Sequence, residues 1–412
     1  MTPNPRDPGP LRVLILSGLQ VHPTQSGGTL RTFGLANALQ SHGLQVFVYS
    51  LVGRKKEYLA RSPSAIERWP GGIEEYVERG LGSFLAGYGS YVLGLPPVWL
   101  TAYLRARSRS LPSLLRQKIE WSDVVVADFP FTYPIFMAPS ARARRHVLST
   151  HNVEHHLLDD SAPWQNRWTR DRVRRIELAA AAASDVLVAC STGDQQFFET
   201  EAKVRQSIVV PNGIDKGRFA GIEARRAETR EGLGIAKDTL VVLFTGSKWG
   251  PNREAFEFLL GFAKSHSDLL EREKIHLIVV GNVTAEPIRL PGFTATGKVD
   301  RAEPYFGAAD AALNPINSGA GTNVKMGEFL AVRLPILTTP FGARGFHIDD
   351  GRTGFVFERE DLSSTLVTVR RLFDEDPVRL RQIAQDAYRE NASSVDMDEC
   401  VRPLVAALGE PG

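Results

Sequence analysis

The chain has 412 residues, with 43% hydrophobic and 23% charged side chains and a formal net charge of +2. This length exceeds one typical domain, and the near-equal numbers of basic (49) and acidic (47) residues exclude the basic surface typical of nucleic-acid-binding proteins. Two cysteines, Cys190 and Cys400, cannot form a disulfide framework or a cysteine-rich metal cluster, so we expect reduced thiols in a cytoplasmic protein.

Strands and helices alternate from the start of the N-terminal half. Residues 11–17 (LRVLILS) form a continuous apolar run typical of a buried parallel strand, 29–41 carry apolar residues on one helical face, and 45–50 predict a second strand. These three elements in succession predict a βαβ unit with a right-handed crossover. Further strands are expected at 124–127, 146–150, 186–189 and 207–210, before the turn Pro211-Asn212-Gly213.

One stretch of the N-terminal half is strongly apolar. Residues 80–104 contain no charged side chain and could span a bilayer, but five glycines and the Pro96-Pro97 pair would break a spanning helix. Either a buried helical hairpin or a surface that touches lipid fits this pattern. The second alternative predicts peripheral contact with an anionic membrane, on its inner face, because cations follow directly. These cations are Arg105, Arg107, Arg109, Arg116 and Lys118.

The C-terminal half repeats the alternation of strands and helices. Candidate strands lie at 240–245, 276–280, 293–296, 311–314, 336–338 and 354–356, with helices such as 253–265 between them. Three further helices are expected at 361–372, 377–391 and 397–408. A polar segment near 215–238 joins the halves. The pattern predicts an α/β protein made of two doubly wound, Rossmann-like domains.

A glycine-rich loop in the C-terminal half is a candidate binding site. Residues 319–331 (GAGTNVKMGEFLA) stand between two predicted strands and lead into a helix. Unpaired N–H groups and the positive end of the helix dipole favour an anion at such a place. Lys325 adds a positive charge, and Glu328 lies one turn further on. A nucleotide fits this pattern, with its diphosphate at the loop and its ribose at the carboxylate; a plain turn is the alternative.

Five motifs, in order, resemble those of the group 1 (family 4) retaining glycosyltransferases of GT-B architecture. They run from about residue 11 to about residue 360. The motifs are SGG at 26–28 with the helix LANALQSHG, STHNVEHH at 149–156 with RIELAAAAASDVLVACS at 175–191, VVPNGID at 209–215, LFTGSKWGPN at 243–252, and GAGTNVKMGEFLAVRLPILTT from 319 onward.

The resemblance implies two Rossmann-like domains facing across a cleft. Residues 1–214 would form the acceptor side, 215–392 would bind a nucleotide-sugar donor, and 393–412 would form a helix that packs back on the first domain. The implied reaction moves a sugar from a nucleotide-diphosphate sugar to an acceptor hydroxyl with retention of configuration, without a cofactor or a metal. The implied acceptor is a sugar, a lipid-linked molecule or a small molecule, in surface polysaccharide, glycolipid or other glycoconjugate synthesis.

The resemblance also assigns site residues. His151, directly after an apolar strand, would contact the transferred sugar or help to position the acceptor; a core histidine is the alternative. Lys325 would balance phosphate charge and Glu328 would hold the ribose, so these three residues are the catalytic candidates. The donor-binding candidates are Gly27, Gly28, Gly246, Ser247, Lys248, Arg253, Gly319, Gly321, Thr322, Asn323, Lys325 and Glu328.

Two positions depart from the family pattern. Ala320 stands where many members carry the first of two glutamates, and Ser247 stands where many carry an arginine. The cations available to balance the phosphate charge are then Lys325, Lys248 and Arg253. A catalytically silent sugar-nucleotide-binding subunit and an epimerase of the same fold are the alternative functions. The donor base, the sugar, the acceptor and the oligomeric state stay open.

Three other charged patterns are weaker candidates for sites. His151 and His155 lie near Glu154 but lack the HExxH pattern and a separate third ligand, so we expect no metal there. The segments 374–376 and 396–398 have the D-x-D form of metal-dependent sugar transferases, yet they lie far from any strand end and are expected to be helix caps or solvated faces. The third pattern is a basic patch, which fits either a solvated helix face or attraction to phosphate or anionic lipid. Its members are Arg167, Arg170, Arg172, Arg174 and Arg175.

Overall fold

A computed structural model describes residues 9–24, 27–51, 64–79, 97–107, 111–142, 144–158, 164–214, 216–319 and 324–409. The chain divides into two compact units, one of residues 1–213 with 400–412 and one of residues 214–399. The motif pattern places this boundary one residue further on. It also assigns residues 393–399 to the returning helix, whereas the structure groups them with the second unit.

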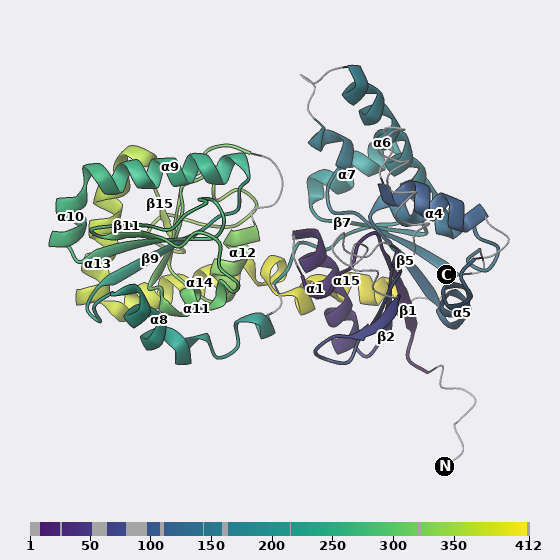
Figure 1. Ribbon diagram of the computed structural model, residues 1–412, viewed down its shortest axis with the longest axis horizontal. Helices are drawn as coiled ribbons and strands as arrows, with labels where there is room; N and C mark the ends of the chain where they lie inside the picture. The colour runs from purple at the N-terminus through teal and green to yellow at the C-terminus, as the bar shows by residue number, and fades with distance from the viewer. Residues whose placement is uncertain are drawn as a thin grey trace, which may run out of the picture. The chain divides into compact units, whose positions relative to one another are not determined.

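The first unit is built on a mainly parallel sheet (Figure 1). Its described part contains eight strands in the order β3-β4-β2-β1-β5-β6-β7-β8, of which β3 and β4 pair antiparallel. All residues of β5 and β7 are buried, as expected of strands covered on both faces. The strands are β1 (Arg12–Ser17), β2 (Gln45–Ser50), β3 (Ala65–Arg68), β4 (Glu74–Val77), β5 (Val124–Asp128), β6 (Arg145–Ser149), β7 (Val186–Ala189) and β8 (Ser207–Val209).

Helices connect these strands, and the predicted βαβ unit is confirmed by the parallel pairing of β1 with β2 around α1. The helices of this unit include α1 (Gly27–Ser41), α4 (Pro97–Arg107), α5 (Ser113–Trp121), α6 (Trp164–Ala183), α7 (Thr192–Glu201) and most of α15 (Met397–Gly409). Two 3₁₀ segments, η1 (Pro130–Met137) and η2 (Glu154–Leu157), follow β5 and β6. The predicted strands near 12, 45, 124, 146, 186 and 207 are all present.

The edge hairpin of β3 and β4 is not predicted by the sequence pattern, because β4 reads EEYV. Glu75 in this strand is nevertheless fully buried. Its carboxylate accepts four hydrogen bonds at 2.5–2.9 Å, so the buried charge is fully partnered. The donors are the N–H groups of Val21 and His22, Ser50 Oγ and Trp69 Nε1.

The second unit has its own sheet. Over the described residues it contains seven strands in the order β11-β12-β10-β9-β13-β14-β15, parallel except for β11 with β12. The strands are β9 (Leu240–Thr245), β10 (Ile275–Val280), β11 (Ile288–Leu290), β12 (Phe293–Ala295), β13 (Ala311–Asn314), β14 (Ile336–Thr338) and β15 (Phe355–Val356). The helices include α8 (Arg226–Leu233), α9 (Gly250–Ser265), α10 (Ser267–Arg272), α11 (Glu303–Ala308), α12 (Val324–Ala331), α13 (Leu362–Glu375) and α14 (Pro377–Val395).

Both faces of this second sheet are covered by helices, as predicted (Figure 1). On one face, Val242 and Phe244 of β9 join a core with residues of α9 and α13. On the other face, Val241 and Leu243 join a core with residues of α11, α12 and α14. Successive residues of β9 therefore point into two different cores, which is the pattern of a doubly wound sheet.

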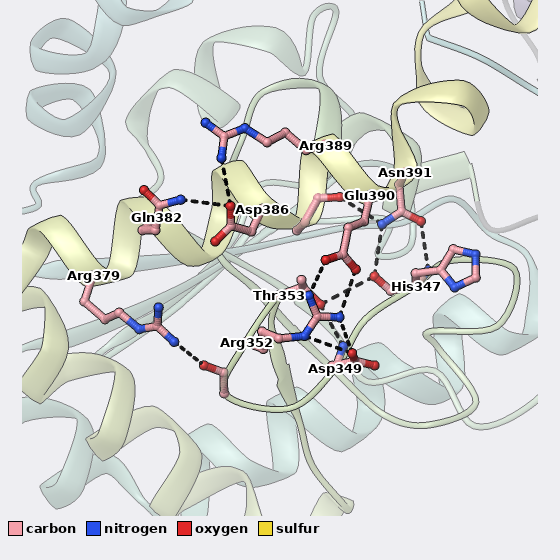
Figure 2. Close-up of polar contacts among 12 residues, drawn as sticks. His347, Asp349, Arg352, Thr353, Arg379, Gln382, Asp386, Arg389, Glu390 and Asn391 are labelled. Atoms are coloured by element: carbon pink, nitrogen blue, oxygen red, sulfur yellow. Dashed lines mark hydrogen bonds and ion pairs between the residues drawn. The ribbon is translucent and has the colours of Figure 1, made fainter.

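Helix α14 holds the loop that leads into β15 (Figure 2). The side-chain amide of Asn391 is buried and exchanges two hydrogen bonds with the backbone of His347, at 2.8 and 3.0 Å. Arg352 of the loop pairs with Asp349 and with Glu390 of the helix. At the last residue of α14, Ile214 N donates to Val395 O at 2.6 Å. The loop and the beginning of the second unit are thus both tied to one helix.

The apolar segment of the first unit is described in part. Residues 80–96 lie outside the described residues, and α4 begins at Pro97. Ala102 and Ala106 of α4 join the core, while Leu104 is 52% exposed. In the part of the chain that the structure describes, none of the helices has the length and apolar character needed to cross a membrane. The lipid contact stays a prediction.

Candidate functional site

Two clusters of predicted site residues lie at the carboxyl ends of strands, one in each unit. In the second unit, residues 246–249 follow β9 and lead into α9. Gly281, at the end of β10, has φ +119°, and a Cβ added there would lie 2.3 Å from Gly246 O. Only glycine fits this close approach of two backbones, which sets the path of the predicted loop Gly246–Ser247.

Lys325 of α12 contacts the first turn of α9. Its Nζ donates to Asn252 Oδ1 at 2.6 Å and lies 4.4 Å from the centre of the Phe244 ring. Asn252 Nδ2 in turn donates to Ser247 Oγ at 3.2 Å. Burial lowers the pKa of Lys325 to about 7, and the charge of Glu328 opposes this shift. The structure therefore brings the predicted residues Ser247 and Lys325 together through Asn252, a residue that the sequence pattern does not single out.

Glu328 lies one turn further along α12 and is held by an arginine. Arg218, in the 3₁₀ segment η3 (Lys216–Phe219), donates from its NH1 to Glu328 Oε1 at 2.6 Å and from its Nε to Glu303 Oε1 at 2.6 Å. Burial raises the pKa of the Glu328 carboxyl, and the charge of Arg218 opposes that rise. Glu328 Oε2 has no hydrogen-bond partner among the described residues.

Gly319, another predicted donor-binding residue, lies beside the start of α9. Gly319 has φ +114°, and a Cβ there would lie 2.7 Å from the Trp249 ring, so the loop passes directly over the start of α9. Lys248 and Arg253 are exposed and form no ion pair with the residues that the structure describes. Gly321, Thr322 and Asn323 lie outside the described residues.

In the first unit, His151 is held by a carboxylate. His151 Nε2 lies 2.8 Å from Asp128 Oδ1, and Thr32 Oγ1 donates to Asp128 Oδ2 at 2.6 Å. Since a carboxylate accepts, His151 Nε2 carries the proton and donates it. The Phe129 ring stacks on the imidazole with the ring centres 3.7 Å apart. Asp128 is the last residue of β5, and the acidic end of VVVAD was the signal that could have found it.

Gly28, the second residue of α1, lies beside this histidine. A Cβ added to Gly28 would lie 3.2 Å from His151 Nδ1 and 3.3 Å from Phe129 Cζ. A side chain at position 28 would therefore cover Nδ1, which has no hydrogen-bond partner among the described residues. Gly27 has open space around its Cα. The structure thus places the predicted site residues Gly28 and His151 next to each other.

His155 and the acidic segment 374–376 have structural partners. His155 Nδ1 pairs with the buried Glu177, and burial lowers the pKa of His155 to about 4, so its ring is neutral. Asp376 caps α14 by accepting from Arg379 N at 2.9 Å, and Asp374 pairs with Arg370 at 2.7 Å. Within the described ranges, no group of three or more His, Cys, Asp or Glu side chains is placed to hold a metal ion.

The basic patch of α6 is also partly engaged. Arg174 pairs with Glu201 of α7, and Arg175 Nε donates to Asp171 O at 3.2 Å. These contacts favour the solvated helix face over a binding surface for the residues concerned. The side chain of Arg167 lies outside the described residues.

Two family models match the chain. The model described as "Glycosyltransferase Family 4" matches residues 26–218, and the model described as "Glycosyl transferases group 1" matches residues 239–375. The chain belongs to the group 1 (family 4) glycosyltransferases. Its two matched regions contain the two residue clusters described above, His151 in the first and Lys325 with Glu328 in the second.

Individual members of this family and fold are distant from the chain. A D-inositol 3-phosphate glycosyltransferase of Geodermatophilus obscurus is 25% identical over 252 residues, which cover 56% of this chain and 54% of the relative. The chain thus spans about half the length of the curated relative it matches. Anabaena HepE in complex with UDP and glucose is 15% identical with a TM-score of 0.61, covering 97% of this chain and 100% of that one.

A sucrose-phosphate synthase from Thermosynechococcus elongatus gives a similar result, with 15% identity, a TM-score of 0.58 and coverage of 96% and 100%. At these identities the solved structures establish the fold. The predicted GT-B fold of this glycosyltransferase-family chain, with two Rossmann-like domains, is confirmed.

Proposed function

We propose that the protein is a retaining glycosyltransferase that moves a sugar from a nucleotide-diphosphate sugar to an acceptor hydroxyl, with no metal in the reaction. The observation that carries this proposal is that Lys325 and Glu328 lie one turn apart on one short helix at the carboxyl end of the second sheet. Asn252 holds Lys325 in place. Family membership supports it, as does the complex of HepE with UDP and glucose.

The donor's diphosphate would lie at Lys325 and at the N-terminus of α12. A leaving diphosphate gains negative charge as the sugar departs, and a fixed cation stabilises that charge without reorganisation. Lys325 replaces the arginine that many family members carry near Ser247, and Asn252 links these two positions. The free oxygen of Glu328, one turn away, would accept hydrogen bonds from the ribose hydroxyls.

His151 would act on the sugar side of the reaction. In the tautomer whose Nε2 proton is engaged by Asp128, the ring offers Nδ1 as an acceptor for a hydroxyl of the transferred sugar or of the acceptor. No carboxylate pair of the kind used for acid and base catalysis is needed in this scheme, because the leaving phosphate would accept the proton of the attacking hydroxyl. The acceptor would belong to surface polysaccharide, glycolipid or other glycoconjugate synthesis.

A cytoplasmic location with peripheral contact to an anionic membrane is part of the proposal. Support comes from the exposed Leu104 on α4, next to Arg107, whose guanidinium stacks on the Tyr103 ring at 4.6 Å. An apolar side chain beside cations is the composition of reversible lipid-binding surfaces. Arg105 and Lys118 have protein partners, Glu78 and the Phe47 ring respectively.

A catalytically silent sugar-nucleotide-binding subunit is the second candidate. Ala320, in place of a family glutamate, favours it. Incubation with a panel of nucleotide sugars and acceptors, in excess EDTA, separates the two functions through release of nucleoside diphosphate. Release that persists in EDTA is the expected result. Binding without release would favour the silent subunit, and loss in EDTA with recovery in manganese or magnesium would contradict the metal-free mechanism.

A further inference from the structure

Arg218 connects two acidic side chains that come from distant parts of the second unit. Its guanidinium donates from NH1 to Glu328 of α12 and from Nε to Glu303 at the start of α11, each at 2.6 Å. All three side chains are largely buried: that of Arg218 is 27% exposed, and those of Glu303 and Glu328 are each 12% exposed. Arg301 also lies near Glu303, 3.6 Å from Oε2, but its side chain is 67% exposed.

The geometry leaves one oxygen of Glu328 unused. NH1 engages Oε1, and Oε2 has no hydrogen-bond partner among the described residues. A guanidinium is planar with its donors in a fixed fork, so two contacts to two carboxylates fix its orientation and the rotamer of each partner. Glu328 is therefore held in one orientation while a second acceptor oxygen stays free for a ligand.

The charges of the cluster make this arrangement depend on Arg218. Three charged groups act on Glu328: Arg218 of η3, Glu303 of α11, and Lys325 of α12, the helix that also carries Glu328. Burial and the charge of Glu303 favour the protonated form of Glu328, whereas Arg218 and Lys325 favour the ionised form. Without Arg218, two buried carboxylates would be left close together, and like charges in such a site resist ionisation of both.

We propose that Arg218 is a positioning residue for the donor: it fixes the Glu328 carboxylate so that Oε2 meets the ribose hydroxyls. The inference rests on the proposed function, in which Glu328 binds the ribose. Arg218 itself acts through Glu328 and need not touch the nucleotide. The residue precedes Phe219 in a short segment with no binding motif, so its role is visible only in the folded chain.

The test measures how much more tightly the protein binds a nucleotide with a ribose than one whose sugar lacks the 2′ and 3′ hydroxyls. Dissociation constants are measured by calorimetry for UDP, GDP and ADP and for their 2′,3′-dideoxy counterparts, with the tightest pair taken forward. The wild-type protein should prefer the ribonucleotide by about tenfold or more, as for a hydrogen bond to a charged group. The ratio of the dideoxy dissociation constant to the ribonucleotide dissociation constant is the quantity compared between variants. Because this ratio compares two ligands on one protein, a general loss of affinity cancels.

Four variants give the comparison. Glu328→Ala and Arg218→Met should both bring the ratio close to one, and Arg218→Lys, which keeps a cation without the fork, should give an intermediate ratio. Arg301→Met is the matched control: it removes an arginine from the same cluster that does not contact Glu328, and its ratio should equal that of the wild type. Thermal unfolding of each variant monitors the fold.

The pH dependence distinguishes positioning from a purely structural role. If Arg218→Met leaves Glu328 protonated at neutral pH, raising the pH should ionise it and restore part of the ribose preference, which damage to the fold would not do. A wild-type ratio in Arg218→Met would overturn the inference, as would a wild-type ratio in Arg218→Lys if Arg218→Met does not fold. A wild-type ratio in Glu328→Ala would instead contradict the ribose role of Glu328, and with it that part of the proposed function.

Discussion

Asp128 accepts a hydrogen bond from His151 Nε2 at 2.8 Å, where the two side chains are only 1% and 5% exposed. Because the second oxygen of Asp128 is engaged by Thr32, the carboxylate cannot turn away from the ring. The pair fixes both the orientation and the tautomer of His151. The unpaired Nδ1 then faces Gly28, where an added Cβ would lie 3.2 Å from it.

Substituting Asp128 tests this relationship. Asp128→Asn keeps the shape but offers an amide that can donate to the ring, which would favour the opposite tautomer. We expect kcat/KM for sugar transfer to fall by about three- to tenfold, the cost of one hydrogen bond, with the affinity for nucleoside diphosphate unchanged. Steady-state kinetics and calorimetry measure the two quantities. Thr32→Val, which removes only the outer partner, should have the smaller effect; unaltered kinetics in Asp128→Asn would exclude the tautomer argument.

Removal of Glu328 should weaken use of the donor. The loss of a charge-assisted hydrogen bond costs on the order of 1.5–3 kcal/mol, so Glu328→Ala should lower kcat/KM for the donor by about ten- to a hundredfold while the protein stays folded. Glu257→Ala, on the exposed face of α9, is the control and should match the wild type. Wild-type kinetics in Glu328→Ala would remove this residue from the site.

Lys325 should make nucleotide binding depend on pH. Its pKa is lowered by burial to about 7 in the free protein, and a bound diphosphate would raise it again by favouring the charged form. Binding above pH 7 must therefore take up a proton, and affinity for a nucleoside diphosphate should fall as the pH rises from about 7 to about 9. Calorimetry in buffers of different ionisation enthalpy should record an uptake of about one proton near pH 8.

The control for this pH dependence is a second lysine of the same region. Lys325→Met removes the titrating group and should bind nucleotide without proton uptake. Lys248→Met removes an exposed cation and should keep the wild-type uptake. An equal uptake in the wild type and in Lys325→Met would place the titration on another group.

Sedimentation with anionic liposomes tests the predicted membrane contact. Binding should occur at low ionic strength and be released at high ionic strength, because each cation near anionic lipid contributes about 1 kcal/mol that salt screens. Leu104→Glu should reduce binding, whereas Val378→Glu, at an exposed apolar side chain of the second unit, should not. Protein that stays in the supernatant at low salt would refute lipid contact.

The strands that carry the fold could be predicted because their signal is local. The sequences of β1 (RVLILS) and β9 (LVVLFT) are almost entirely apolar, and a turn or helix follows each, so no distant contact is needed to recognise them. The hairpin of β3 and β4 could not be predicted in the same way. Glu75 reads as a surface residue until four donors from other parts of the chain surround it.

The site shows the same division between local and distant information. Lys325 and Glu328 are three residues apart on one helix, so their proximity follows from sequence spacing. Their partners do not: Asn252 lies 73 residues from Lys325, and Arg218 lies 110 residues from Glu328. Asn252 ends the motif at 243–252, but nothing in that motif indicates contact with Lys325. Arg218 lies in an ordinary turn, so both roles appear only once the chain is folded.

The pairing of Ile214 with Asp396 has a consequence for how members of this family can diversify. The chain enters the second unit and leaves it at neighbouring points, so this unit resembles a domain inserted into the first one. A segment with adjacent ends can be exchanged as a block while both joints stay in place. Replacing 214–399 by the matching segment of a relative would thus exchange Lys325 and Glu328 together, while Asp128 and His151 stay with the resident first unit.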